Sequence, residues 1–149
     1  MEGLILIEAK AHDMELKSEG KSISDKENHE QIGSAIREAH IGLNKICHGW
    51  LINRDSHYQL CNRFAWAWKV ASCGVPVILI YLGFLHADEM SRCGRPFLPH
   101  LDWRALMLDH SKTLVPTIGW DSRLQTNGAP MWAMVRSLDL QREVGNCSR

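Results

Sequence analysis

Residues 4–10, Leu-Ile-Leu-Ile-Glu-Ala-Lys, form an apolar run that closes on two charges. Four consecutive apolar residues, β-branched at every second position, predict a strand that is covered on both faces. Because side chains alternate across a strand, Glu8 and Lys10 point to the same face, at the place where the apolar residues end. Burying a charge costs free energy unless the charge is paired or metal-bound. The two charges therefore form either a structural ion pair or a functional site.

The Glu-x-Lys pattern occurs three times in the chain, and only the copy at Glu8 and Lys10 closes an apolar strand. The other two copies lie within residues 15–21, in a polar stretch with serine and glycine that predicts a solvated loop. Only the pattern at the end of the strand is therefore a candidate for a functional site.

A strand that ends in Glu-x-Lys, followed by a helix and a second apolar strand, resembles the catalytic half of the PD-(D/E)XK nuclease superfamily. Residues 58–64 (YQLCNRF), with the helix that follows them and the apolar run at 77–85, are similar to that superfamily as well. The resemblance covers about residues 4–85. It implies one α/β domain over residues 1–149, with a restriction-endonuclease-like core that is N-terminally incomplete. This core is a mixed sheet with helices packed on it, and residues 86–149 form a C-terminal extension.

The resemblance also implies metal-dependent hydrolysis of nucleic-acid phosphodiesters, with DNA as the expected partner. Glu8 and the backbone carbonyl of Ala9 would ligate Mg²⁺ or Mn²⁺, which favour oxygen ligands. Lys10 would position or deprotonate the attacking water, or stabilise the charge on the phosphate. In the family, a Gln at the start of the following helix, in a Gln-xxx-Tyr pattern, helps to hold the substrate. That role falls here on Gln59, with Arg63 standing where the family has Tyr.

The sequence departs from the family at the metal-binding Asp, which usually lies on the preceding strand. Glu2 is the only acid before the strand, and six residues of extended chain put it about 20 Å from Glu8. The chain is then a shortened piece of a longer nuclease-like protein, or a degenerate relative, or its site is completed by Asp13 or Glu15. We expect the chain as given to be a poor nuclease by itself. A non-catalytic binding or assembly module and an unrelated small α/β protein remain the alternatives.

Two helices are predicted between the strands. The first begins at a capping box of Ser24 and Glu27, and the second begins near Ser56 with a similar box that includes Gln59. Gln59 therefore has a structural interpretation beside its functional one. The apolar stripes of the two helices recur at steps of three and four residues, at positions 32, 36, 39, 43 and 46 and at positions 60, 64, 67 and 71.

The apolar run at 77–82 predicts a central strand, and the helical crossover before it favours parallel pairing with residues 4–10. In the C-terminal part, Asp102 is predicted to cap a short helix that ends near Lys112. Residues 131–136 are predicted to form a closing strand at an edge of the sheet. The chain is therefore expected to be α/β throughout.

Composition bounds the class of protein. The 149 residues carry 17 basic and 17 acidic side chains, so no net charge draws the chain to nucleic acid or membrane, although residues 1–40 hold five basic and nine acidic groups. Five cysteines without a Cys-x-x-Cys motif predict reduced thiols in a cytoplasmic protein. The longest apolar run, at 75–85, is too short to span a bilayer, so no membrane partner is expected. The oligomeric state is left open.

Overall fold

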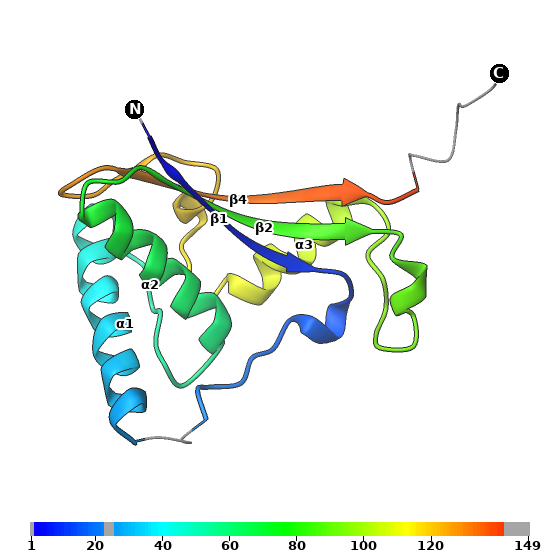
Figure 1. Cartoon of the computed structure of the whole chain (residues 1–149), viewed down its shortest axis with the longest axis horizontal. Helices are drawn as coiled ribbons and strands as arrows, with labels where there is room; N and C mark the ends of the chain where they lie inside the picture. The colour runs from blue at the N-terminus through cyan, green and yellow to red at the C-terminus, as the bar shows by residue number, and fades with distance from the viewer. Residues whose placement is uncertain (1, 23–25, 142–149) are drawn as a thin grey trace.

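Strands in the order β1-β2-β4-β3 form one mixed sheet in the computed structural model, which describes residues 2–22 and 26–141 (Figure 1). β1 pairs parallel with β2, β2 pairs parallel with β4, and β3 is antiparallel to β4. The predicted α/β class with a mixed sheet is confirmed. The bounds of the strands are Leu4–Lys10 (β1), Val77–Leu85 (β2), Leu124–Gln125 (β3) and Pro130–Asp139 (β4).

β1 and β2 pair as the sequence predicted. Their register places Glu8 beside Tyr81 and Lys10 beside Gly83. Two helices between the strands carry the chain back to the end of the sheet at which β1 begins, and parallel pairing requires such a crossover. Both charged residues therefore lie at the carboxyl end of β1, next to the second half of β2.

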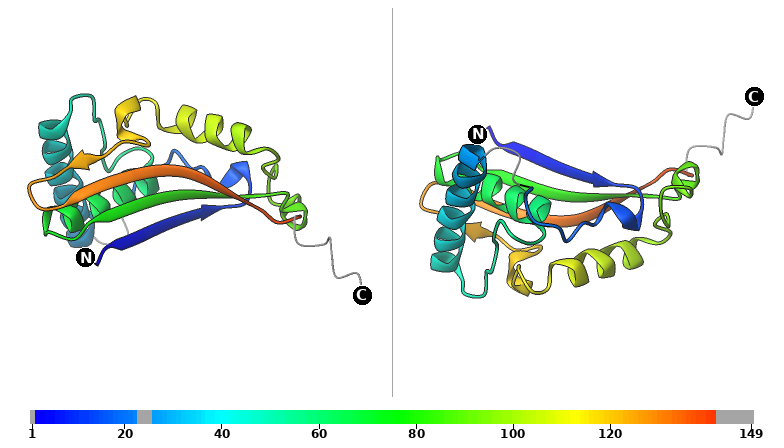
Figure 2. Two further views of the ribbon diagram at one scale, coloured as in Figure 1. Left: turned by 90° about the horizontal axis from the view of Figure 1, so that it is seen from above. Right: turned by 90° about the horizontal axis from the view of Figure 1, so that it is seen from below.

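The helices α1, α2 and α3 all lie on one side of the sheet (Figures 1 and 2). On that side, Phe64 of α2 stacks on Tyr81 of β2, with 6.3 Å between the ring centroids. The indole of Trp103 on α3 lies against Gly83, where a Cβ atom would come within 2.7 Å of the ring. The bounds of the helices are Lys26–Ile46 (α1), Tyr58–Ser72 (α2) and His100–Ser111 (α3).

The opposite face of the sheet is not covered by a helix (Figure 2). Ile5 and Ile7 point to that face, and each is 58% exposed. The prediction that residues 4–10 are covered on both faces is therefore wrong. An apolar run alone does not distinguish a central strand from an edge strand, and β1 lies at an edge of the sheet within the described residues.

The start of α2 differs from the prediction. The helix begins at Tyr58, and the residue before it, His57, has a left-handed backbone with φ of 46° and no side-chain cap. The amides of His57 and Tyr58 donate instead to the backbone carbonyls of Ser18 (2.9 Å) and Glu19 (3.0 Å). The predicted capping box at Ser56 is not formed, because a distant segment of the chain satisfies these amides. In the box predicted for α1, Ser24 lies outside the described residues.

The remaining elements follow the sequence with small corrections. The apolar stripe of α1 is confirmed by the burial of Ile36, Ala39 and Leu43. α3 begins after Pro99, so Asp102 lies in its first turn and does not cap it. The closing strand is β4, but its predicted edge position is wrong because the short β3 pairs with its far side. Neither α1 nor any other helix in the described ranges could cross a membrane, since none is both long and apolar enough.

Candidate functional site

Glu8 and Lys10 form a nearly buried ion pair on the helix-covered face of β1. The ammonium nitrogen of Lys10 lies 2.8 Å from Oε1 of Glu8, and the two side chains are 9% and 13% exposed. The alternation of the strand placed them on one face, as predicted. Because this pair has so little contact with water, removing one partner would leave an uncompensated buried charge, which costs more free energy than breaking a pair on the surface.

Two residues of α2 complete a network around this pair. Nε of Arg63 donates to Oε2 of Glu8 at 2.7 Å, and Nζ of Lys10 donates to Oε1 of Gln59 at 3.0 Å. Residues four apart share a face of a helix, so the first turns of α2 direct both side chains toward the end of β1. The four side chains named from the sequence therefore lie together, although their chemical roles stay predictions.

Gln59 faces the ion pair and caps nothing. Its carbonyl oxygen accepts from Lys10, and the start of α2 makes no side-chain cap. The structural interpretation of Gln59 as a helix cap is therefore wrong. Its contact joins α2 to the carboxyl end of β1.

The pKa of Glu8 shows how this network balances. Burial alone raises the pKa of the Glu8 carboxyl, but the hydrogen bonds from Lys10 and Arg63 outweigh burial and hold the pKa below its usual value. Beside it, burial and then the charge of Glu8 raise the pKa of Tyr81 well above its usual range. Glu8 is thus a carboxylate at neutral pH, and Tyr81 is a neutral phenol.

Residues outside the network of Glu8, Lys10, Gln59 and Arg63 also surround the ion pair. A cavity of about 10 Å³ lies beside it. Glu15 lines this cavity, and its carboxylate accepts from the backbone amides of Ala11 and His12. The prediction that residues 15–21 form a solvated loop is therefore wrong for Glu15, which is half-buried and is held by these amides of the preceding turn. The cavity is lined by Glu8, Lys10, Glu15, Leu16, Lys17, Gln59, Leu60, Tyr81, Met107 and His110.

Of the two acids proposed to return to the site, only Glu15 does so. Asp13 turns away, because its carboxylate accepts from the backbone amide of Arg95 at 2.9 Å and pairs with the Arg95 side chain at 3.8 Å. The loop after β1 therefore brings one additional carboxylate, and not two, to the cavity.

A pair of histidines borders the site where α2 meets α3. The rings of His57 and His110 lie 4.6 Å apart between centroids. Burial, and then the charges of His57 and Lys10, lower the pKa of His110 to about 4. His110 is therefore a neutral imidazole at physiological pH. No sequence pattern pointed to it, because its position depends on the packing of α3 against β2.

The residues present do not fit the metal ion that the family resemblance implied. Both carboxylate oxygens of Glu8 already accept hydrogen bonds from cationic side chains. Within residues 2–22 and 26–141, no three side chains of His, Cys, Asp or Glu are grouped so that they could hold a metal ion. Mg²⁺ sheds water reluctantly and needs several well-placed oxygens, which one shared carboxylate and the Ala9 carbonyl do not supply.

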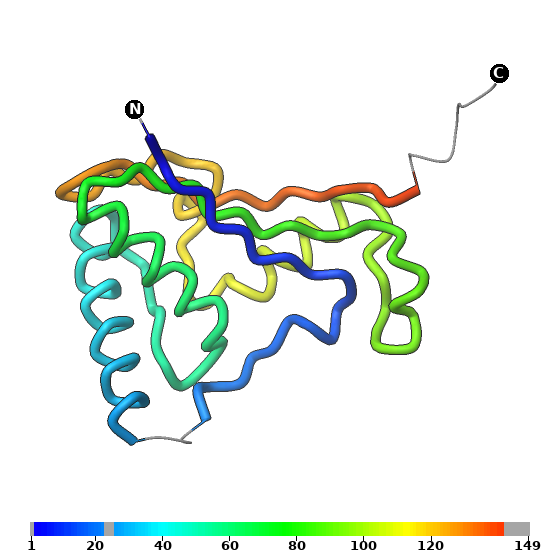
Figure 3. Tube along the Cα trace, in the orientation of Figure 1, coloured from blue at the N-terminus to red at the C-terminus, as the bar shows by residue number. Residues whose placement is uncertain are grey.

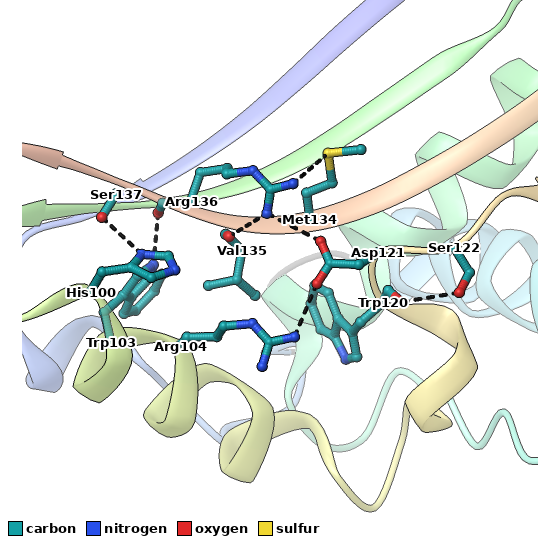
Figure 4. Close-up of polar contacts among 10 residues, drawn as sticks. All are labelled: His100, Trp103, Arg104, Trp120, Asp121, Ser122, Met134, Val135, Arg136 and Ser137. Carbon is teal, nitrogen blue, oxygen red and sulfur yellow. Dashed lines mark hydrogen bonds and ion pairs between the residues drawn. The ribbon is translucent and has the colours of Figure 1, made fainter.

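A second polar cluster lies on the far side of β4 (Figure 4). Asp121, at a positive φ of 53°, accepts from Arg104 of α3 at 3.0 Å and from Arg136 of β4 at 3.1 Å. Nearby, the indole nitrogen of Trp103 donates to the carbonyl of Arg136 at 2.9 Å. These contacts bind α3 to the sheet, so the cluster holds in place the helix that carries His110.

The larger hollows of the molecule lie elsewhere. One of about 440 Å³ lies between α1 and residues 51–55 and is lined by none of the four predicted site residues. Its size is that of a small-molecule pocket, but its volume alone does not indicate chemistry. The ion-pair network remains the best candidate because its Glu8–Lys10 pair is nearly buried and its side chains converge from two elements.

Comparison with protein-family models, with curated proteins and with solved structures found no match for this chain.

Proposed function

We propose that the network of Glu8, Lys10, Gln59 and Arg63 is a nuclease-like site for nucleic-acid phosphodiesters, of the PD-(D/E)XK kind. The observation that carries the proposal is the convergence of these four side chains at the carboxyl end of one parallel strand. Ligands of open α/β sheets gather at such strand ends.

Charge suits the network to a phosphate. Lys10 and Arg63 carry two positive charges against the single negative charge of Glu8, which leaves an excess of one. Ammonium and guanidinium groups bind phosphate oxygens through charge-assisted hydrogen bonds. Glu8 keeps the two cations in place, and the Gln59 amide, which accepts from Lys10, offers its N–H groups to a neighbouring oxygen.

The site lacks some of the groups that hydrolysis of a phosphodiester requires. Glu8, held as a carboxylate by two cations, is a weak general base at neutral pH. Metal-dependent cleavage of DNA or RNA requires a further carboxylate beside Glu8, and Glu15, whose carboxylate accepts from the backbone amides of Ala11 and His12, does not supply it in this conformation. We therefore propose a site that binds phosphodiesters and cleaves them weakly when the chain is alone.

Incubation of the purified chain with plasmid DNA and single-stranded DNA and RNA, in Mg²⁺ and in Mn²⁺, tests the catalytic part. We expect slow cleavage that Glu8→Gln and Lys10→Met each reduce, by about 10²-fold or to below detection. The matched control is the exposed ion pair of α1 and α2, changed as Glu38→Gln and Lys69→Met, which leaves cleavage unaltered. Cleavage that persists at the wild-type rate in Glu8→Gln contradicts a catalytic role for this site.

A non-catalytic binding module is the second candidate. It is favoured by the pairing of both Glu8 oxygens, which leaves neither oxygen free. The two candidates separate in the same experiment, since a binding module retains nucleic acid but cleaves none with either metal ion. Lys10→Met then lowers retention without any change in substrate integrity.

A further inference from the structure

The Glu8–Lys10 site is closed in this structure. Lys10 is 8% exposed, and the cavity beside it holds about 10 Å³. Such a volume admits about one water molecule, whereas a phosphate group is several times larger. A phosphodiester can therefore reach the ammonium group of Lys10 only after a neighbouring segment moves.

The walls of the cavity differ in how firmly they are built. One wall belongs to β1, β2, α2 and α3, whereas the other is formed by Glu15, Leu16 and Lys17. These three residues belong to the segment 13–21, which we call the strap. Figure 3 shows the strap running from the end of β1 back past the start of α2. Apart from a single 3-10 turn at Asp13–Glu15, the strap has no regular structure.

The strap is held mainly by hydrogen bonds near its two ends and buries little apolar surface. Its residues 17–20 are exposed, and Leu16 is its one side chain packed against the hydrophobic core. Its backbone is joined to the start of α2 through Ser18 and Glu19, to the Arg54 carbonyl through the Lys21 amide (3.0 Å), and to the Arg95 carbonyl through the Asp13 amide (3.1 Å). The ammonium of Lys21 also lies 5.5 Å from the ring centroid of Tyr58. Segments with little buried apolar surface and exposed hydrogen bonds open at low free-energy cost.

The strap places hydrogen-bond-accepting oxygens at the site, as a phosphate group would. The carbonyl oxygens of Ser18 and Glu19 accept from the amides at the start of α2, and the Glu15 carboxylate lines the cavity of Lys10. Phosphate oxygens form hydrogen bonds with such amides and cations. Departure of the strap also removes the negative charge of Glu15, which repels an anion.

We propose that residues 13–21 are an autoinhibitory strap that closes the Glu8–Lys10 site and competes with the phosphodiester for it. The inference rests on the proposed function, since it describes how that same site is regulated. The affinity for a phosphodiester is then the intrinsic affinity multiplied by the fraction of molecules in which the strap is open. The reactivity of Lys10 toward an amine reagent scales with the same fraction.

Gly20→Ala is the sharpest variant. A Cβ atom at Gly20 would lie 2.6 Å from the backbone oxygen of Asp55, which cannot move aside cheaply, so the strap must lift. Asp13→Ala is a second variant that removes the strap's side-chain contacts with Arg95, leaves the backbone hydrogen bond between the two residues, and covers the case in which the first variant does not fold. Gly3→Ala, at the start of β1 and away from the strap, is the matched control.

The experiment labels intact protein with an amine-reactive reagent and reads each lysine by mass spectrometry, with the exposed Lys45 as internal reference. The same proteins are titrated into a fluorescent single-stranded oligonucleotide. We expect wild-type Lys10 to react far more slowly than Lys45, and Gly20→Ala to raise its rate about tenfold. Affinity for the oligonucleotide then rises by the same factor, and Gly3→Ala changes neither quantity.

The outcomes separate the strap from the function. Wild-type Lys10 that reacts as fast as Lys45, or no acceleration in both strap variants, overturns the strap. Acceleration of Lys10 without oligonucleotide binding by any variant supports the strap and overturns the phosphodiester function. Equal gains in labelling rate and affinity support both.

Discussion

Arg63 and Glu8, 55 positions apart in the sequence, meet at 2.7 Å across the interface of α2 and β1. Arg63 keeps 41% of its side chain exposed, whereas Glu8 keeps 13%. The carboxylate is thus reached from the buried side by Lys10 and from the open side by Arg63. A group held in this way fixes both the packing of the helix and the charge at the strand's end.

Replacing Glu8 by Gln is expected to destabilise the fold. The substitution leaves the Lys10 ammonium almost buried without a counter-charge, and uncompensated buried charge costs about 3 kcal/mol, reduced here because Arg63 can turn to water. Urea unfolding measures the loss, and Glu38→Gln, which breaks an exposed pair, is the control. Equal midpoints for the two variants would show that the Glu8 network contributes nothing to stability.

The stability of the protein is expected to fall in acid in two steps. The pKa of His110 is about 4 in the fold, below its usual 6.5, so the unfolded chain binds more protons between these values and stability falls as the pH drops through that window. The pKa of Glu8 is lowered, so its contribution is present above pH 4.5 and is lost as the pH falls through its folded value. Urea midpoints at pH 7, 5.5 and 4.5 measure the first step, which His110→Gln removes. If the urea midpoint of His110→Gln decreases from pH 7 to pH 5.5 by as much as that of the wild type, other groups cause the first step.

The two faces of the sheet are expected to respond differently to mutation. Leu79 is completely buried under the helices, so Leu79→Ala costs about 2–5 kcal/mol. Ile5 points to the uncovered face at 58% exposure, so Ile5→Thr changes stability by about 0.5 kcal/mol or less. Thermal unfolding of both variants compares them. A large loss for Ile5→Thr would mean that the outer face is covered in solution.

Gln59→Ala separates the two interpretations of that residue. Because α2 starts without a side-chain cap, the variant is expected to keep the helix content of the wild type and to lose less than about 1 kcal/mol. Its affinity for an oligonucleotide falls, since the Lys10 ammonium loses a positioning partner. Circular dichroism and an affinity titration read the two effects, and loss of helix with unchanged affinity would restore the capping role.

Local patterns were enough to predict β1, β2 and β4 and the shared face of Glu8 and Lys10, but not the short β3. Alternation along β1 placed Glu8 and Lys10 on one face, and the helical crossover required parallel pairing with β2. The resemblance to the nuclease superfamily, through its Gln-xxx-Tyr pattern, singled out Gln59 and Arg63, which the structure places beside Glu8 and Lys10. Each of these predictions depends on residues that are close in sequence or on a single connection.

The parts that could not be predicted depend on distant contacts. The capping of α2 by the carbonyls of Ser18 and Glu19 leaves no trace in the residues around Ser56, which themselves suggested a capping box. The uncovered outer face of β1 follows from the position of all the helices on one side. His110 reaches the site only because α3 packs on Gly83, where no side chain intervenes.

The affinity of the chain for a fluorescent single-stranded oligonucleotide, compared between wild type, Lys10→Met and Lys69→Met, tests the central claim most directly. Lys10 lies in the network, whereas Lys69 is an exposed lysine on the same helix as Gln59. Loss of one charge-assisted contact predicts about tenfold weaker binding for Lys10→Met and a stronger effect at low salt. Lys69→Met is predicted to bind as the wild type does. Equal affinities for all three proteins would contradict a phosphodiester site at Glu8 and Lys10. The absence of binding by the wild type and by both strap variants, Gly20→Ala and Asp13→Ala, would contradict it as well.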